Sequence, residues 1–329
     1  MGLRAWKLAL AGPALYWYFP VFFALLTSST EVSPVGLAAL LVVLMVSAAW
    51  GFLVNDLADR AADSRSGRAD VLHGHGLGSR SMVALVLATA GVSWAVVFLI
   101  GGGYVFKVVL AIDYAVAVLY SVRPPKLKVR RFWGFLANSL IERPLPIVVL
   151  LTYMNYYTYA TVALPILMEL TWSVFKHQTA DIRGDIAAGV DTFAASLGEK
   201  VSTRIVMDVL NPLSVASLLV LVGMAWVGVE DMRGPLAAAL AVSGIAVVVA
   251  FVGERLGRLR TYLTPTDPPY IIALNLSYRY VVLPAMAYGV LAYRASYYPV
   301  VILLAVSLGY QSAAYVRMVR KAFGGGSHG

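Results

Sequence analysis

The stretch that decides the fold is GLAALLVVLMVSAAWGFLVNDLADRAAD, residues 36–63. Its first part, 36–56, is apolar and long enough to cross a bilayer as a helix. Its last part carries Asp56, Asp59 and Asp63, which stand at i, i+3 and i+7 and share one face of a helix. Packed carboxylates repel one another unless a cation joins them. A single group of this kind is more simply a solvated helix end, so a second group has to support a cation site.

A second acidic group follows another apolar segment later in the chain. Asp181 and Asp185 are four residues apart and also share a helix face. Carboxylates are scarce here, with 17 Asp and Glu in 329 residues. Oxygen-only sites suit Mg²⁺, which is commonly held by one or two carboxylates together with substrate phosphates. Two such clusters on one side of a membrane therefore favour a metal–diphosphate site.

Composition places the chain in the membrane class. Hydrophobic residues make up 60% of the sequence, charged residues only 13%, and the mean hydropathy is +0.77. The absence of cysteine excludes a disulfide framework, a thiolate zinc site and a cysteine nucleophile. These features predict an all-α, polytopic helical bundle.

Ten apolar stretches are candidate spans. Each has roughly the 18–25 residues that a bilayer requires. They lie near 8–28, 36–56, 80–100, 104–121, 132–153, 157–176, 204–228, 235–253, 271–293 and 297–316.

The distribution of basic residues predicts how the bundle is oriented. With the N-terminus in the cytoplasm, most of the 26 Lys and Arg fall on the cytoplasmic side. The formal net charge of +9 is then mainly a topology signal, and we expect no nucleic-acid partner. Both aspartate clusters and the basic loop 120–128 face the cytoplasm in this arrangement, in a multi-pass protein of the cell membrane.

The order of the segments suggests a loose twofold repeat. Each aspartate cluster follows two apolar hairpin helices, and the long loops 57–79 and 177–203 occupy matching places. We expect one domain over 1–323, with halves at about 1–130 and 131–253 followed by C-terminal helices. Residues 324–329 read as a flexible tail or an artificial appendage.

Acids that hold Mg²⁺ and bases that grip phosphate oxygens are the parts needed to bind a diphosphate and help it leave. An aromatic-lined cavity could shelter the carbocation that such ionisation creates. The candidates for that lining are Tyr16, Trp17, Tyr18 and Trp172, of which none is assigned individually because most of the aromatics should serve packing.

Three motifs resemble those of the UbiA superfamily of intramembrane prenyltransferases. The first is Asn55-Asp56-x-x-Asp59-x-x-x-Asp63, and the second is Asp181-x-x-Gly184-Asp185-x-x-x-Gly189-x-x-Thr192. The third is the run Tyr120-Ser121…Pro124-Pro125…Leu127-Lys128, which is similar to the loop after the family's fourth helix. Their order after spans two, four and six also agrees with that family.

The resemblance implies nine spans around a central cavity capped by cytoplasmic loops. It also implies transfer of a prenyl group from a polyprenyl diphosphate, with Mg²⁺ as cofactor, to a lipophilic or aromatic acceptor. Asp56, Asp59, Asp181 and Asp185 would face the metal, with Asp63 in support, and Asn55 would orient the first metal site or the substrate. The residues implied to contact the diphosphate are Tyr120 and Lys128, with Arg123 or Lys126 adding to the grip.

The sequence departs from the family after Asp63. The family usually continues with Asn-x-Pro-x-Arg-Pro, whereas residues 64–69 here read Ser-Arg-Ser-Gly-Arg-Ala. Arg65 or Arg68 could supply the missing basic contact to the diphosphate. The nearby pair His73 and His75 is expected to be part of a solvated loop.

Several ionisable residues fall inside the predicted spans, where each is costly and therefore informative. We expect Asp113 and Arg279 to form a buried pair across helices, and Glu142 and Arg143 to find partners or line the acceptor pocket. Polar contacts to the acceptor are expected from Glu142 or His177. His177 lies one turn before Asp181 and could instead support the metal site.

Three other functions remain open beside transfer. A UbiA-like terpene cyclase would ionise the same diphosphate but quench the cation within its own chain. An ion-coupled transporter would place its site near the bilayer midplane on broken helices, whereas these aspartates lie at one rim. An alcohol phosphatidyltransferase would need an Asp-Gly-x-x-Ala-Arg motif, which the sequence lacks.

Overall fold

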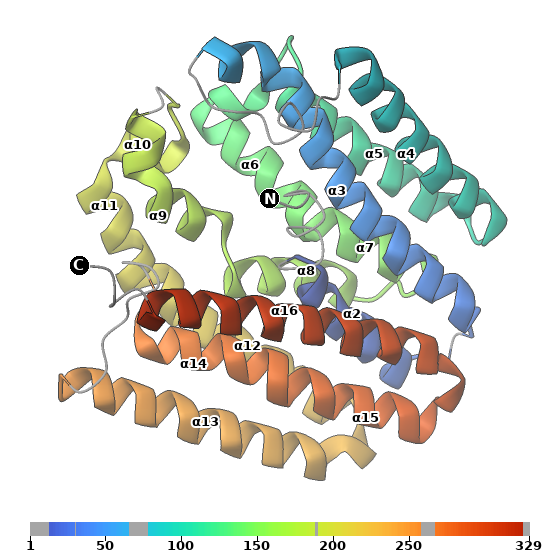
Figure 1. Cartoon of the computed structure of the whole chain (residues 1–329). Coiled ribbons are helices and arrows are strands. Elements are labelled where there is room, and N and C mark those ends of the chain that lie inside the picture. Colours follow the sequence, from blue (N-terminus) through green and yellow to red (C-terminus); the bar gives the residue numbers. More distant parts are fainter. Residues whose placement is uncertain (1–12, 30, 66–77, 188–189, 258–266, 325–329) are drawn as a thin grey trace.

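The chain folds into a bundle of helices (Figure 1). The computed structural model describes residues 13–29, 31–65, 78–187, 190–257 and 267–324. The longer helices are α2 (Pro13–Thr27), α3 (Pro34–Arg65), α4 (Ser79–Leu99), α5 (Tyr104–Ser121), α6 (Arg131–Glu142), α7 (Pro144–Tyr153), α8 (Ala160–Thr171), α9 (Val174–Ala187), α12 (Asn211–Gly228), α13 (Arg233–Arg255), α14 (Pro269–Ser277), α15 (Leu283–Tyr293) and α16 (Tyr298–Gly324).

Short elements connect these helices. They are α10 (Phe193–Leu197), α11 (Glu199–Arg204), the 3₁₀ turns η2 (Leu127–Val129), η4 (Glu230–Met232) and η6 (Ala295–Tyr297), and the π-helical turns η3 (Ile205–Leu210) and η5 (Tyr278–Val282). Every regular element in the described ranges is helical, which confirms the predicted all-α class.

The helices have the lengths that a membrane requires. Within the described residues, seven are long and apolar enough to cross a bilayer: Pro34–Arg60, Arg80–Leu99, Tyr104–Ser121, Arg131–Tyr153, Glu199–Gly228, Glu230–Arg255 and Pro269–Tyr293. The chain is therefore a multi-pass membrane protein. A total of ten spans would require α2, α8 and α16 in addition, and a total of nine would require two of these three.

The predicted span 157–176 is wrong as a continuous helix. The stretch 157–176 breaks into α8, with only 12 residues, and α9, because Trp172 leaves the helical region with φ −141° and ψ 68°. The side chain of Glu169 accepts a hydrogen bond from the backbone N–H of Val174 at 3.0 Å. This bond satisfies one of the free donors at the start of α9, so the chain begins a new helix there.

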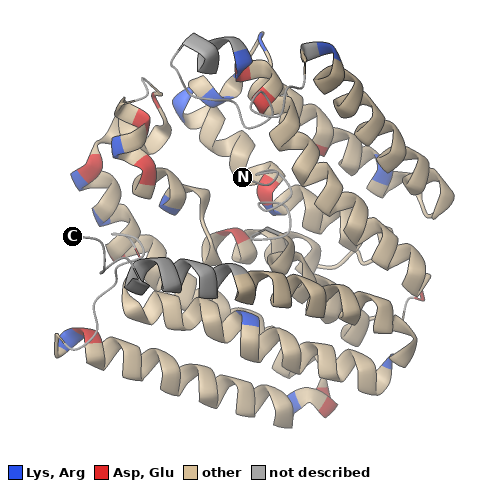
Figure 2. Ribbon diagram, viewed as in Figure 1, with Lys and Arg blue, Asp and Glu red and all other residues tan. Residues whose placement is uncertain are grey.

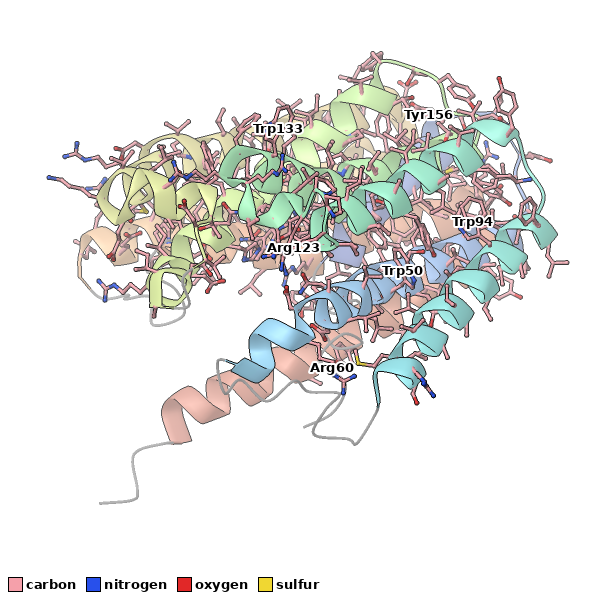
Figure 3. All side chains as sticks on the ribbon, turned by 90° about the horizontal axis from the view of Figure 1, so that it is seen from above. Trp50, Arg60, Trp94, Arg123, Trp133 and Tyr156 are labelled. Atoms are coloured by element: carbon pink, nitrogen blue, oxygen red, sulfur yellow. The ribbon has the colours of Figure 1, made fainter. Side chains whose placement is uncertain are left out.

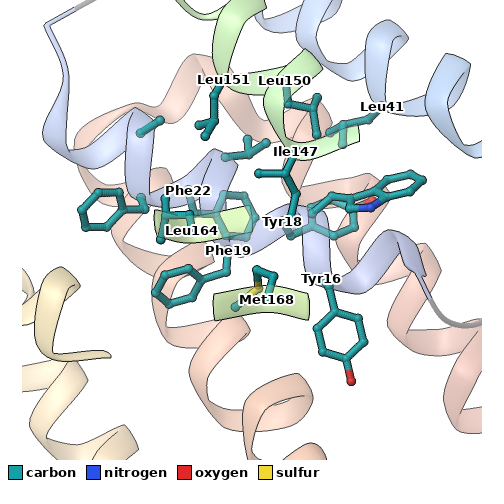
Figure 4. Packing of buried hydrophobic residues seen from close by; sticks show 14 of the residues in the cluster. Tyr16, Tyr18, Phe19, Phe22, Leu41, Ile147, Leu150, Leu151, Leu164 and Met168 are labelled. Atoms are coloured by element: carbon teal, nitrogen blue, oxygen red, sulfur yellow. The ribbon is translucent and has the colours of Figure 1, made fainter. Parts of the chain in front are cut away.

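Helix α2 forms the centre of the bundle. It is apolar on all sides, and it packs against α7 and α8 of one group of helices and against α12, α15 and α16 of the other. Figure 4 shows Phe19 and Phe22 of α2 beside Ile147 and Leu150 of α7 and Leu164 of α8. A helix that is hydrophobic all round is buried in this way because it has no polar face for solvent.

Charged residues gather at one end of the bundle. Figure 2 shows them where α3 ends, where α6 begins and on α9–α11, whereas the middles of α4 and α13 carry none. Since all three sequence motifs lie on these segments, the fold gathers them at a single rim.

Candidate active site

The end of α3 presents the first aspartate motif to the basic loop that follows α5. Lys128 Nζ donates a hydrogen bond to Asn55 Oδ1 at 2.7 Å and forms an ion pair with Asp59. Lys126 Nζ donates to the other carboxylate oxygen of Asp59 at 3.1 Å. The side chains of Lys126, Lys128 and Asp59 are only 11%, 16% and 19% exposed. Two lysines therefore face one carboxylate in a partly buried place, and this group of three carries a net positive charge.

Local geometry fixes the lysine loop. Lys126 adopts a left-handed conformation with φ 48°, and its backbone N–H donates to Val122 O at 2.8 Å. Gly134 of α6 lies directly beneath the loop. A Cβ at this position would lie 2.7 Å from Leu127 O and 2.9 Å from Lys128 Cα, closer than real contacts allow. The missing side chain thus lets α6 approach the loop and hold Lys128 against α3.

The second aspartate motif lies on α9. Asp185 accepts a hydrogen bond from Thr192 Oγ1 at 3.1 Å, and Thr192 also caps α10 by accepting from the N–H of Ala195. Asp191 accepts from Arg131 Nε at 2.7 Å, so the loop after α9 is tied to the start of α6.

An aromatic cluster holds the α9 region on α6. The ring of Phe193 in α10 lies 5.9 Å from Phe132, 5.5 Å from Phe135 and 5.9 Å from Phe175. Such pairs add packing energy beyond their buried area. The same helix α6 therefore positions both the lysine loop and the second motif.

Tyr120 lies between the two motifs. Its hydroxyl experiences the charges of Asp59, Glu142 and Asp185, and it occupies the last turn of α5 just before the lysine loop. Arg123, which Figure 3 labels, is exposed and has no ion-pair partner among the described residues. Tyr120 thus lies near acidic residues of both aspartate motifs.

The predicted site residues are placed unequally. Asn55, Asp59, Lys126 and Lys128 are in direct contact, and Asp181 and Asp185 lie on α9 as expected. Asp56 follows Asn55 in α3 and has its own interactions. Asp63 and Arg65 belong to the last turns of α3, but their side chains lie outside the described part of the chain. The residues that lie entirely outside it are Arg68, His73 and His75.

The donor set fits magnesium that is shared with a substrate. Among the described residues, no three His, Asp or Glu side chains are close enough to hold a metal ion alone. Mg²⁺ is usually held by one or two carboxylates plus phosphate oxygens rather than by a protein cage. Asp56 and Asp59 on one side and Asp181 and Asp185 on the other would fit this pattern.

The two residues expected near the acceptor differ in their surroundings. Glu142 accepts from Arg143 at 2.9 Å and lines a cavity, whereas His177 is not among the cavity-lining residues and packs edge-on against Trp172 at 5.1 Å. Burial is the largest effect on His177 and lowers the pKa of its imidazole, with Arg143 acting in the same direction.

Arg143 is the centre of a buried ion-pair network. It is fully buried and donates to Glu142 at 2.9 Å and to Glu169 at 2.8 Å. The expectation that Glu142 and Arg143 find partners is therefore confirmed. Since α6 ends at Glu142 and α7 begins at Pro144, this network also fixes the break within the span 132–153.

The expected pair of Asp113 and Arg279 is wrong. Arg279 donates to Gln311 at 2.9 Å and to the Tyr16 hydroxyl at 3.4 Å. The reason is that η5, which carries Arg279, packs against α13, α14 and α15, whereas α5, which carries Asp113, packs against α3, α6 and α7. The two residues thus belong to opposite sides of the bundle.

A cavity of about 250 Å³ runs inward from the rim. It is lined by residues of α2, α3, α5, α6 and α7: Trp17, Leu44, Ser47, Ala48, Gly51, Phe52, Asn55, Asp113, Ala117, Tyr120, Ser121, Asn138, Ile141, Glu142 and Pro146. Asn55 and Tyr120 stand at its rim end, so the cavity begins at the candidate diphosphate site.

Sequence reasoning missed Gly134 and the lining role of Asp113. The only signal for Gly134 was its place shortly after the lysine loop, and a glycine there is uninformative without the fold. Asp113 was noticed as an intramembrane acid, but the cavity that it lines is formed by helices far apart in sequence.

Sequence comparison identifies the family that has this arrangement of helices and motifs. The profile of the UbiA prenyltransferase family matches residues 17–262. The chain belongs to the UbiA prenyltransferase family. A comparison with curated protein sequences finds no match.

Solved structures of UbiA homologues share the fold. A homologue from Archaeoglobus fulgidus bound to DMAPP and Mg²⁺ has a TM-score of 0.57 at 16% identity, covering 95% of this chain and 98% of its own. The same homologue bound to GPP and Mg²⁺ has a TM-score of 0.50 at 16% identity, covering 94% and 98%. The apo homologue from Aeropyrum pernix K1 has a TM-score of 0.53 at 16% identity, covering 85% and 97%.

Proposed function

We propose that this chain transfers a prenyl group from a prenyl diphosphate to a lipophilic or aromatic acceptor, with Mg²⁺ as cofactor. The observation that carries the proposal is the contact of Lys126 and Lys128 with Asp59 and Asn55 at the mouth of the cavity. Two cations beside metal-type carboxylates suit a ligand that brings both phosphate oxygens and a metal ion. The family, and homologues solved with DMAPP or GPP and Mg²⁺, support the same chemistry.

The acidic residues of the site would bind the metal ion, and the basic residues would bind the diphosphate. Asp56 and Asp59 on α3, and Asp181 and Asp185 on α9, would hold Mg²⁺ against the diphosphate from opposite sides. Bound there, Mg²⁺ neutralises the negative charge of the leaving diphosphate. Lys126, Lys128 and Tyr120 would contact the diphosphate oxygens, with Arg123 close by. Arg65 and Arg68 are proposed as further basic contacts.

The reaction breaks the bond between prenyl C1 and the diphosphate oxygen, and the electron pair leaves with the diphosphate. The acceptor supplies the electron pair for the new bond to C1 and loses a proton. Lys126 and Lys128 favour this step because they stabilise the charge that builds up on the leaving group. The positive-inside distribution of Lys and Arg supports a cytoplasmic position for this rim.

The test is release of diphosphate from radiolabelled geranylgeranyl diphosphate by the purified protein, with Mg²⁺ or EDTA, and with and without a panel of lipophilic and aromatic acceptors. The proposal predicts Mg²⁺-dependent release and a labelled acceptor adduct. A labelled hydrocarbon or alcohol formed equally well without acceptor would instead establish the terpene cyclase. If donors of several lengths show no release above the EDTA control, the enzyme assignment is overturned.

A further inference from the structure

Asp113 lies where a membrane protein normally keeps an apolar side chain. It belongs to the buried stripe of α5, together with Leu110, Tyr114 and Ala117, whereas Ile112 and Leu119 on the opposite face are exposed. Only 7% of Asp113 is exposed, and the residue lines the cavity. It therefore faces the inside of the bundle and the cavity rather than lipid.

One oxygen of the Asp113 carboxyl group lacks a hydrogen-bond donor. Its Oδ1 atom is buried and has no hydrogen-bond partner among the described residues. The hydroxyls of Ser47 and Tyr114 are already engaged: Ser47 Oγ donates to Val43 O at 2.8 Å and lies 2.6 Å from the Tyr114 hydroxyl. Since a hydroxyl has one proton, Tyr114 must donate to Ser47, and neither group can donate to Asp113. A buried polar atom left in this state is costly unless something else binds it.

The position of Asp113 sets the shape of a matching ligand. It lies seven residues before Tyr120 on α5, and Ser47 lies eight residues before Asn55 on α3. Both are therefore about 10 to 12 Å deeper than the rim end of the cavity. A ligand that reaches Asp113 and also meets the diphosphate must be elongated along this line.

The lining favours an acceptor over a prenyl tail. Nearly half of the lining residues are polar, and a hydrocarbon tail would leave the buried Oδ1 atom of Asp113 unsatisfied. The volume of about 250 Å³ exceeds that of an engineered cavity of about 150 Å³ that holds benzene. A fused two-ring system thus fits the space.

We propose that this cavity is the acceptor pocket and that Asp113 selects acceptors with a hydroxyl or amino group at the end away from the diphosphate. This inference rests on the proposed function, which makes the ligand of the cavity an acceptor. Binding of ligands to the cavity, and its preference for a hydrogen-bond donor, can be measured without turnover. Asp113 is here a specificity-determining residue that accepts a hydrogen bond from the ligand.

The experiment compares two probes of similar size, 2-naphthol and 2-methoxynaphthalene, of which only the first has a donor. Binding to the purified full chain is measured by equilibrium dialysis in one detergent for wild type, Asp113→Leu and Asp113→Asn. The ratio of the two dissociation constants is compared between proteins, so that partition of each probe into micelles cancels. We expect wild type to prefer 2-naphthol by about tenfold, Asp113→Leu to lose this preference, and Asp113→Asn to keep part of it.

Ser243→Ala is the matched control, because Ser243 on α13 is buried outside the cavity and its hydroxyl has no partner in the part of the chain that the structure describes. It should keep the wild-type ratio. A ratio that is equal in wild type and Asp113→Leu, or failure of wild type to bind either probe, overturns the inference. If Asp113→Leu does not fold, the test rests on Asp113→Asn. A ratio of dissociation constants in Asp113→Asn equal to that of wild type contradicts a hydrogen bond from the ligand to the carboxylate.

Donor release, measured in parallel with wild type, separates this inference from the proposed function. If Asp113→Leu loses the preference for 2-naphthol but wild type releases no diphosphate, the pocket is supported and the transferase is contradicted. If wild type releases diphosphate with Mg²⁺ but the ratio of the two dissociation constants is the same in wild type and Asp113→Leu, the transferase is supported and the role of Asp113 is contradicted.

Discussion

Lys128 makes the most informative contact in the molecule. It joins the basic loop, predicted to bind the diphosphate, to the first aspartate motif, predicted to bind the metal ion. It touches both Asn55 and Asp59 of the first aspartate motif. The lysine thus neutralises the carboxylate that we propose to face Mg²⁺. Binding of a diphosphate with its metal ion would then redirect Lys128 from the carboxylate to phosphate oxygens.

Replacing Lys128 should weaken donor binding. Loss of a hydrogen bond to a charged group predicts an increase in the KM for geranylgeranyl diphosphate of about tenfold to a hundredfold in Lys128→Ala. Lys128→Arg should recover part of it. The control is Lys200→Ala, because Lys200 is exposed on α11. Steady-state kinetics at saturating Mg²⁺ check this prediction, and an unchanged KM in Lys128→Ala would contradict the proposed contact.

Arg143 is predicted to be a stabilising residue. Arg143→Met leaves Glu142 and Glu169 buried together without their shared cation, which should cost about 3 to 5 kcal/mol of unfolding free energy. Adding Glu142→Gln and Glu169→Gln should restore most of the loss. Thermal unfolding in detergent measures both, and Arg183→Met, at an exposed ion pair with Glu199, should cause no measurable change. Equal unfolding of Arg143→Met and wild type would argue against the network.

His177 predicts how stability depends on pH. Burial lowers the pKa of His177 in the folded state. Just below pH 6.5, the ordinary pKa of histidine, the imidazole therefore binds a proton in the unfolded chain but stays neutral in the folded chain. The stability from neutral His177 is therefore fully present above pH 6.5 and is lost as the pH falls below it toward the depressed folded pKa. Unfolding temperatures between pH 8 and 5 should decline less in His177→Gln than in wild type. Parallel curves for the two proteins would rule out this contribution.

At the scale of elements, α6 is the organising helix of the site. It supports the lysine loop through Gly134, is tied to the second motif through Arg131 and Asp191, and packs on α9 and α10 through the cluster of phenylalanines. Moving α6 would therefore disturb both motifs together.

Gly134→Ala tests this role. The added Cβ meets backbone atoms of Leu127 and Lys128, which have no flexible end that could yield, so the loop must move. We expect a KM for the donor raised by about tenfold, since the contact of Lys128 would be lost. Gly91→Ala in α4, where a Cβ meets nothing, should leave the KM unchanged. A normal KM in Gly134→Ala would show that α6 does not position the loop.

At the scale of the whole molecule, the apolar runs predicted most of the helices, because a bilayer imposes both their length and their composition. The break between α8 and α9 was missed because it depends on Glu169, whose partner Arg143 is distant in sequence. The prediction that Asp113 pairs with Arg279 was wrong for a similar reason, because the charges of two residues do not indicate on which side of the bundle their helices pack. The motifs predicted the kinds of residue in the site, whereas their contacts needed the fold. The single domain over 1–323 with two related halves remains a prediction.

We propose that the two aspartate motifs act together on one diphosphate. The most direct test measures Mg²⁺-dependent release of diphosphate from geranylgeranyl diphosphate in Asp59→Ala, Asp185→Ala and the double variant, with the exposed Asp231→Ala as control. If the motifs form one site, each single variant should lose at least about a hundredfold in rate, and the double variant should be hardly worse than either. Losses that simply add, or a single variant with wild-type release, would contradict a shared site.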